Sequence, residues 1–213
     1  MTQSPPMSGR KAEAARNDTR ILQAAREVFV ANPDSPISAV AERAGVGISA
    51  LYRRYPSKED LLRTLSANGL RTYLDAVEEA LENADDVAGA WARFLERVVE
   101  ADTHALTTAL AGTFTPTEEL YRDSELARVS NERLVERAKQ AGVVRKDLDV
   151  NDLSFIFEQL SAVRLGDEQR TRILRRRYLT LYLRAMRPDP TEPDPLPGPP
   201  PTWQEIGERW APK

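Results

Sequence analysis

The stretch SAVAERAGVGISALY, residues 38–52, decides the fold of the N-terminal part of the chain. Its first half predicts a short helix with Ser38 as its cap, ending at Gly45. Its second half predicts a further helix over residues 48–55, which Pro56 stops. Only a tight turn would separate these two helices.

The turn has the composition that a close, nearly perpendicular helix crossing needs. Such a crossing requires a small residue facing the partner backbone and a turn residue that tolerates a positive φ. Ala41 and Gly45 meet these two conditions. The pattern predicts a helix-turn-helix, whose second helix lies in the major groove of DNA. An ordinary helical hairpin is the alternative.

The second helix of the motif is expected to have two distinct faces. Leu51 and Tyr55 fall on the core side, and Ser49, Arg53 and Arg54 fall on the solvent side. A plain Ala-rich hairpin would not normally combine these faces, which favours the helix-turn-helix.

The charge distribution agrees with a DNA-reading module at one end of the chain. The 213 residues carry a net charge of −3, yet residues 1–58 hold nine Lys/Arg and five Asp/Glu. This excess of four positive charges leaves a net −7 on the remaining 155 residues. A basic head on an acidic body is typical of a small nucleic-acid module joined to a regulatory domain.

Apolar residues at helical spacing predict an all-α chain without a sheet. We expect a disordered arm over residues 1–18 and a three-helix helix-turn-helix DNA-binding domain over 19–65. A helical ligand-binding and dimerisation domain should follow over 66–187. The last part, 188–213, should be a Pro-rich tail with a short terminal helix.

Several helix starts and one connection are predicted from local signals. Thr19 should cap the first helix, Ser57 the long connecting helix and Thr115 a later helix with Pro at its first position. Helices over 151–165 and 168–187 are joined by so short a link that they should pack antiparallel.

At the residues around this motif the chain resembles the TetR family of bacterial transcriptional regulators. The resemblance covers residues 19–62, including LYRRYPSKEDLL over 51–62. The family usually has His where this chain has Arg54, Ser where it has Gly47, and Thr or Asn where it has Ala50. The resemblance implies a homodimer on a palindromic double-stranded operator, a small-molecule effector, no cofactor, and repression as the default activity.

The resemblance also implies particular DNA contacts. The expected phosphate anchors are Ser38, Tyr52, Arg54 and Lys58. The expected base-reading residues are Ile48, Ser49 and Arg53, with Ala50 close enough to touch a thymine methyl. An Arg fork pairs bidentately with guanine, so Arg53 is the expected specificity residue; one more phosphate contact is its alternative role.

Large apolar residues could line a pocket for an apolar or amphipathic effector, although a core needs the same residues. The expected ligand contacts are Trp91, Phe94, Leu95, Val98, Phe114, Tyr121 and Phe157. We expect His104 to be a surface or capping residue, with a ligand contact as the alternative. Arg164 should pair with Glu158 or Glu168, or else with a ligand carboxylate. A regulator whose second domain binds protein is the alternative function.

The last two long helices should form a four-helix bundle with the same pair of a second protomer, as the resemblance implies. The expected interface residues are Leu160, Val163, Ile173, Leu174, Tyr178, Leu181 and Tyr182. The Arg175-Arg176-Arg177 run is expected to be solvated or paired with acidic residues.

The tail holds eight Pro in residues 188–201, which predicts an extended segment. Thr202 and Glu205 supply a capping box for a final helix with Trp203, Ile206 and Trp210 on one face. This face should dock on an apolar surface of the same or the second protomer. A disordered tail is the alternative.

Composition excludes several other classes. The chain has no Cys and one His, which leaves no disulfide, thiol nucleophile or His-based metal cluster. No stretch approaches the roughly 20 apolar residues of a membrane span, and residues 1–20 lack a signal-peptide core. A cytoplasmic location without membrane contact is expected. No acidic pair, Gly-rich phosphate loop or triad indicates an enzyme.

Overall fold

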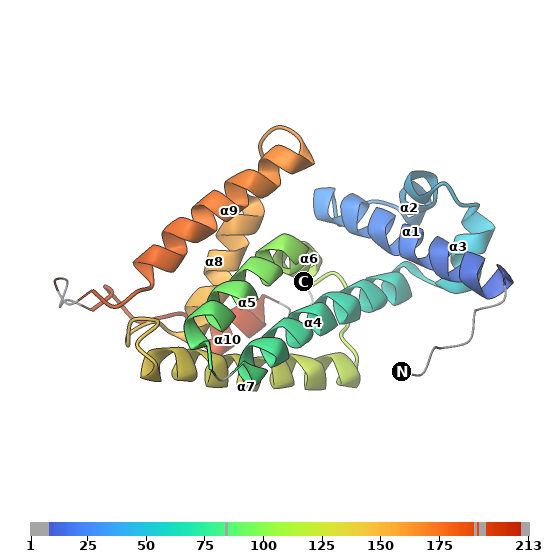
Figure 1. Ribbon diagram of the computed structural model, residues 1–213. Helices are drawn as coiled ribbons and strands as arrows, with labels where there is room; N and C mark the ends of the chain where they lie inside the picture. Colours follow the sequence, from blue (N-terminus) through green and yellow to red (C-terminus); the bar gives the residue numbers. More distant parts are fainter. Residues whose placement is uncertain (1–8, 84, 190, 192–194, 210–213) are drawn as a thin grey trace. The chain divides into compact units, whose positions relative to one another are not determined.

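The computed structural model describes residues 9–83, 85–189, 191 and 195–209, and their regular structure is entirely helical (Figure 1). The all-α fold predicted from the sequence is confirmed. The chain divides into two compact units, Met1–Leu65 and Ser66–Lys213. None of the described helices is long and apolar enough to cross a membrane.

The N-terminal unit packs three helices and the start of a fourth around a small core. These helices are α1 (Gly9–Ala31), α2 (Ile37–Ala44), α3 (Ile48–Arg54) and α4 (Lys58–Glu82), of which α4 continues into the second unit. Helix α1 packs on α2, and α2 packs on α3. The fully buried side chains are those of Phe29, Val40, Leu51, Tyr55, Leu61 and Leu62.

Helix α1 begins at Gly9, so the part of the expected arm from residue 9 to 18 is helical. Thr19 lies inside the helix, where its hydroxyl donates to the carbonyl of Ala15 at 3.1 Å, and is not a cap. Residues 10–18 include three Ala, two Arg, one Lys and one Glu, which favour helix without an apolar face. The apolar pattern therefore missed this extension. Residues 1–8 lie outside the described part of the chain.

Two of the expected N-terminal caps have different outcomes. Ser57 caps α4 as predicted, because its Oγ accepts from the N–H of Asp60 at 3.0 Å. Ser38 does not cap α2; that helix begins at Ile37, the N-cap position is Pro36, and no side chain caps it. A Pro before the helix already fixes an extended φ, so the helix can start one residue earlier than the Ser suggested.

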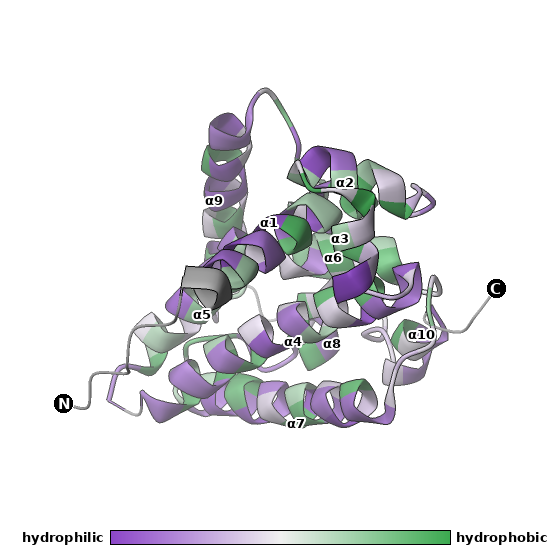
Figure 2. Cartoon of the chain, turned by 90° about the vertical axis from the view of Figure 1, so that its right-hand side faces the viewer, coloured by the Kyte–Doolittle hydropathy of each residue, from purple (hydrophilic) through white to green (hydrophobic). Residues whose placement is uncertain are grey.

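The C-terminal unit is built around one central helix. Its helices are α5 (Val87–Ala101), α6 (Thr103–Leu110), α7 (Glu118–Gln140), α8 (Val150–Ala162), α9 (Glu168–Ala185) and α10 (Trp203–Glu208). Helix α5 packs against α6, α7, α8 and α9. Hydrophilic and hydrophobic residues alternate along most of these helices (Figure 2), so each can turn one face to the core.

Several helices begin or end a few residues away from the positions predicted from the sequence. The cap of α7 is Thr117, whose Oγ1 accepts from the N–H of Leu120 at 3.2 Å, and not Thr115. Asp149 forms a capping box for α8 that the sequence analysis missed. Helix α8 ends at Ala162, and α9 turns back beside it after a five-residue link (Figure 1), as expected for an antiparallel pair.

Candidate functional site: a helix-turn-helix surface and a regulatory core

The turn between α2 and α3 has a left-handed residue at the predicted place. Gly45 has φ 62°, and the N–H of Val46 donates to the carbonyl of Ala41 at 3.0 Å. This six-to-one bond is typical of a helix end closed by glycine. Arg20 of α1 donates from Nη2 to the carbonyl of Ala44 at 2.5 Å, which satisfies another helix-end oxygen. The turn is thereby held by a backbone hydrogen bond of its own and by a side chain of α1.

Helix α3 has the two faces that the sequence predicted. Leu51 is 0% and Tyr55 2% exposed. The opposite face carries most of the expected DNA contacts: Ile48, Ser49, Tyr52, Arg53 and Arg54 are exposed, and Ala50 is half-buried. Ser38 of α2 is exposed as well. The backbone is therefore held firmly while one face stays open.

Arg54 is paired inside the protein. Its Nε and Nη2 donate to the carboxylate of Asp18 at 2.7 and 3.0 Å, and the hydroxyl of Tyr55 donates to the same carboxylate at 2.7 Å. Burial raises the pKa of Asp18, but these hydrogen bonds outweigh it and the pKa lies below its ordinary value. The carboxylate thus joins α1 to the end of α3. Sequence reasoning missed Asp18 because it placed this residue in the arm.

Lys58 also has an internal partner. Its Nζ donates to the carbonyl of Pro33 at 2.8 Å and lies 5.1 Å from the ring centroid of Phe29. Arg43 of α2 pairs with Glu27 of α1 at 2.5 Å. Arg53, in contrast, forms no hydrogen bond or ion pair with the described residues. Of the cations of α3, Arg53 is therefore the one with its charge available.

The expected ligand residues of the C-terminal unit form a closed core. Trp91, Phe94, Leu95, Val98 and Phe157 are at most 2% exposed and belong to one cluster. Phe94 and Phe157 meet edge to face, with their ring centroids 6.2 Å apart. Phe114 is buried too.

One expected ligand contact lies outside this core, and two others line surface clefts. Tyr121 is 59% exposed, because it lies on the outer side of α7. The first cleft is lined by Trp91 and its neighbours on α5, by residues 141–143 after α7, and by residues at and just beyond the end of α9. A second cleft is lined by Phe94 together with charged and small residues of α4 and α5. The expected set is thus a packed core around which a ligand would have to open space.

His104 is half-buried and packs against aromatic rings, contrary to the expectation of a surface or capping residue. Its ring centroid lies 4.8 Å from that of Phe157 and 5.9 Å from that of Tyr73. Its Nδ1 is buried and has no hydrogen-bond partner in the described part of the chain. Burial lowers the pKa of His104 to about 4; Glu158 raises it and Arg209 lowers it further. The ring contacts with Phe157 and Tyr73, which the sequence does not reveal, hold His104 on the inner side of α6.

A buried arginine, Arg175, fastens α9 to its neighbours. It is 5% exposed, pairs with Asp102 at 2.9 Å and donates to the carbonyls of Ser161 and Val163. Arg164 pairs with Asp102 at 3.9 Å and not with Glu158 or Glu168. Those two carboxylates are paired with other arginines, in the tail and in α9.

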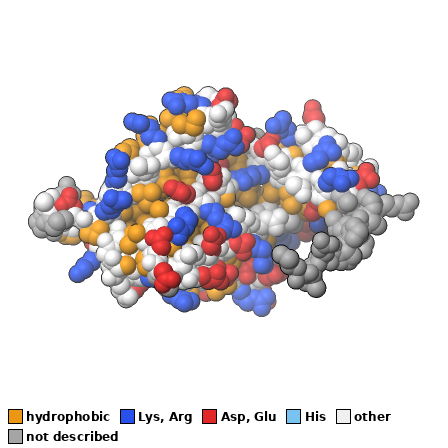
Figure 3. Space-filling view, in the orientation of Figure 1, with side chains coloured by type: hydrophobic (Ala, Val, Ile, Leu, Met, Phe, Trp, Pro, Cys, Tyr) orange, Lys and Arg blue, Asp and Glu red, His pale blue; other side chains and the backbone are white. Residues whose placement is uncertain are grey.

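The expected dimer residues divide into two groups. Leu160 and Leu174 are buried inside the protomer, so they serve its own core and are not available to a partner. Val163 and Tyr182 are half-buried. Ile173, Tyr178 and Leu181 are 41 to 53% exposed, and the sequence analysis missed Leu165, which is 62% exposed. Figure 3 shows hydrophobic side chains among Lys and Arg over the region of α9.

A fixed turn, a buried inner face and an exposed outer face on α3 define a helix-turn-helix DNA-binding protein. The family model of bacterial regulatory proteins of the tetR family matches residues 21–65. The model of the C-terminal domain of SbtR-like transcriptional regulators matches residues 86–188.

Individual relatives agree with these matches. The HTH-type transcriptional repressor LfrR of Mycolicibacterium smegmatis is 34% identical over 138 residues, which cover 62% of this chain and 70% of LfrR. A TetR regulatory protein from Mycobacterium vanbaalenii has a similar structure, with a TM-score of 0.55 and 26% identity over 84% of this chain and 99% of its own. The structure of LfrR with proflavine matches with a TM-score of 0.51 and 23% identity over 79% and 96% of the two chains.

The chain belongs to the TetR family of bacterial transcriptional regulators. It is therefore a DNA-binding regulator and not an enzyme.

Proposed function

We propose that the protein is a ligand-responsive repressor that binds a palindromic operator as a homodimer. The exposed face of α3 carries this proposal. Arg53 has no partner there among the residues that the structure describes, and it is exposed, as are Ile48 and Ser49. An unpaired guanidinium on a rigid helix can pair bidentately with guanine without first losing another bond.

The phosphate contacts would come from a second group of residues. Tyr52 and Ser38 are exposed and can donate their hydroxyl hydrogens at once. Arg54 and Lys58 would have to exchange, or share, their bonds to Asp18 and to the Pro33 carbonyl. We therefore expect Arg54 and Lys58 to contribute less than their charge suggests.

The dimer would form through the exposed apolar residues of α9 and of the α8–α9 link. Leu165, Ile173, Tyr178 and Leu181 supply a face that water would otherwise cover. In such a two-fold dimer the recognition helices would lie about 34 Å apart, or somewhat more, as successive turns of a palindrome require.

The effector would be a small apolar or amphipathic molecule bound among α5 to α8. The aromatic cluster of the C-terminal unit supports this class, as does the structure of the relative LfrR with proflavine. Its binding would lower the affinity for DNA, and DNA would lower the affinity for the effector by the same factor.

The experiment is a binding-site selection with random duplexes, followed by affinity measurements at several salt concentrations. Arg53→Ala should cost about 1 to 3 kcal/mol and relax the preference at one base pair in each half-site. Lys58→Ala should weaken binding to all sequences alike and flatten the salt dependence. Identical base preferences for the wild type and Arg53→Ala would remove Arg53 from base readout.

The effector part is tested separately with proflavine. Saturating proflavine should release the protein from the selected operator. If proflavine binds and the operator affinity stays unchanged, the coupling is wrong even though the ligand site exists.

A further inference from the structure

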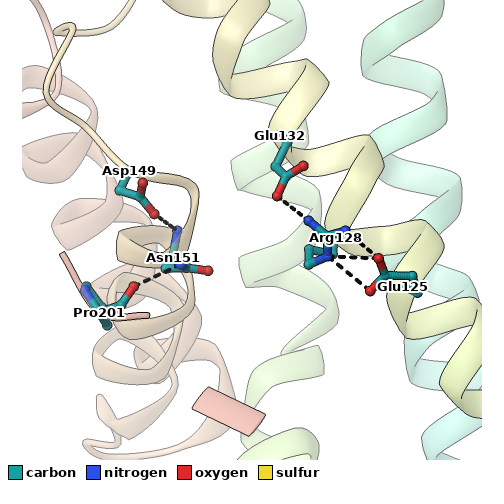
Figure 4. Close-up of polar contacts among 6 residues, drawn as sticks. All are labelled: Glu125, Arg128, Glu132, Asp149, Asn151 and Pro201. Atoms are coloured by element: carbon teal, nitrogen blue, oxygen red, sulfur yellow. Dashed lines mark hydrogen bonds and ion pairs between the residues drawn. The ribbon is translucent and has the colours of Figure 1, made fainter. Parts of the chain in front are cut away.

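The C-terminal segment, residues 195–209, is attached along its own α8. At its start, the N–H of Leu196 donates to Oδ2 of Asp147 at 2.7 Å. Further along, Nδ2 of Asn151 donates to the carbonyl of Pro201 at 2.8 Å (Figure 4). Asn151 is itself fixed, because its N–H donates to the capping carboxylate of Asp149 at 2.9 Å. Both contacts hold an extended chain to the beginning of α8.

The end of the segment is held by a two-pronged ion pair. Nη1 and Nη2 of Arg209 donate to the two carboxylate oxygens of Glu158 at 2.7 and 2.9 Å. The guanidinium carbon also lies 5.8 Å from the ring centroid of Phe155. The predicted capping box of Thr202 and Glu205 is present and starts the short helix α10 between these attachments.

His104 belongs to α6, which packs on α8, the helix that carries this ion pair. Phe157 precedes Glu158 on α8, and its ring contacts that of His104 at 4.8 Å. The charges of Glu158 and Arg209 move the pKa of His104 in opposite directions, Glu158 raising it and Arg209 lowering it. A buried ring nitrogen without a partner costs free energy, which a ligand that hydrogen-bonds to it would recover.

The attachment of the segment is polar and easily reversed. No residue of α10 is buried, and Trp203 remains 45% exposed. The apolar docking expected from the Trp residues is therefore incomplete in the described part, and Trp210 lies outside it. Exposed ion pairs and single hydrogen bonds contribute little each, so the segment can leave and return.

We propose that residues 195–209 form a strap across α8, and that the effector enters beneath it at His104. The strap is inferred from the attachments described above. The entry of the effector at this place depends in addition on the proposed response to an effector. The ligand class is an aromatic molecule with one hydrogen-bonding group, which would pack on Phe157 and pair with Nδ1 of His104. The tail would thus set how readily the regulator responds.

The strap can be tested without an effector. His104 is the only histidine in the sequence, so acylation by diethyl pyrocarbonate, followed at 240 nm at pH 7, reports on it alone. Arg209→Ala should raise this rate about fivefold, the factor that loss of an exposed ion pair implies. Exchanging the charges with Glu158→Arg and Arg209→Glu should restore the slow rate.

A matched control removes an ion pair that the tail does not use. Arg128 pairs with Glu125 and Glu132 within α7 (Figure 4), so Arg128→Ala should leave the rate unchanged. Thermal melts should show that all variants remain folded at the assay temperature. Equal rates for the wild type and Arg209→Ala would overturn the strap.

Proflavine titration then tests the role of the strap in ligand entry separately from the proposed effector class. Arg209→Ala should bind proflavine more tightly than the wild type. Equal affinities would overturn the role of the strap in ligand entry. Faster acylation of His104 without any proflavine binding would support the strap and contradict the proposed effector class.

Discussion

The structures of the helix-turn-helix and of the regulatory core are determined by different kinds of interaction. In the N-terminal unit a few backbone requirements decide the arrangement: a left-handed Gly45, a small Ala41 and an Asp18 that ties α1 to α3. In the C-terminal unit the order comes from many similar apolar side chains around α5. The structure of the N-terminal unit can be predicted from the identity of single residues. The structure of the C-terminal unit depends on which apolar residues contact one another.

This difference has a functional side. The outer face of α3 is already ordered in the absence of DNA, because the inner face of the helix is packed in the core of its unit. The aromatic residues expected to contact the ligand are instead packed against one another. A ligand would have to displace or spread them, which suits a unit that must change state on binding.

The largest expected effect tests whether the aromatic cluster is core. Phe157→Ala should lower the free energy of unfolding by about 3 to 5 kcal/mol, because it leaves a cavity among packed rings. Urea denaturation measures this loss. Phe155→Ala, at a side chain that is 37% exposed, should cost far less. Similar small losses for both variants would mean that Phe157 already faces an open pocket.

The second effect concerns pH and the half-buried imidazole. The pKa of His104 is about 4 in the folded chain and near 6.5 when unfolded, so the unfolded state takes up a proton first. Stability should therefore be fully present above pH 6.5 and fall as the pH drops toward 4. The loss is about 3 kcal/mol at most. The measurement is the unfolding free energy of the wild type minus that of His104→Gln across this range.

Carboxylates that titrate in the same range affect both proteins alike and cancel in this difference. A difference that stays constant from pH 7 to 4.5 would show that His104 is hydrated.

The third effect tests the backbone of the turn. Gly45→Ala should cost about 1 to 2 kcal/mol, since φ is 62° and the new Cβ would lie 3.0 Å from Nη2 of Arg20. Operator affinity should fall with it. Gly47→Ala is the control, because its φ is −66° and no atom lies within 4 Å of the added Cβ. Equal losses for both glycines would contradict a special role for Gly45.

Sequence alone predicted the helix-turn-helix because its signals are local. Gly45, Pro56 and the two faces of α3 are all visible within 20 residues. Helix positions in the C-terminal unit were also predictable to within a few residues, from apolar spacing and caps.

Contacts between distant residues were not predictable. The Asp18–Arg54 pair joins residues 36 positions apart, and Arg209–Glu158 joins residues 51 apart. The local pattern does not distinguish a solvated Arg run from one whose first member, Arg175, is buried against the end of α8. The partial burial of His104 depends in the same way on Phe157 and Tyr73, which come from other helices.

The smallest expected effect concerns the carboxylate behind the recognition helix. Asp18→Asn removes one negative charge and releases Arg54, whose guanidinium could then bind a phosphate. Stability should fall by about 1 kcal/mol, because the remaining amide accepts more weakly from Arg54 and Tyr55. Affinity for non-specific duplex DNA should rise, and its salt dependence should steepen by about one released ion.

Glu27→Gln is the matched control for Asp18→Asn, since it also removes one negative charge from α1, paired there with Arg43 of α2. Its effect on non-specific binding should be smaller, because Arg43 does not lie on the recognition helix. If both variants shift the salt dependence equally, the gain comes from net charge alone. If only Asp18→Asn does so, Asp18 holds Arg54 back, and specificity is preserved by keeping a cation off the phosphates.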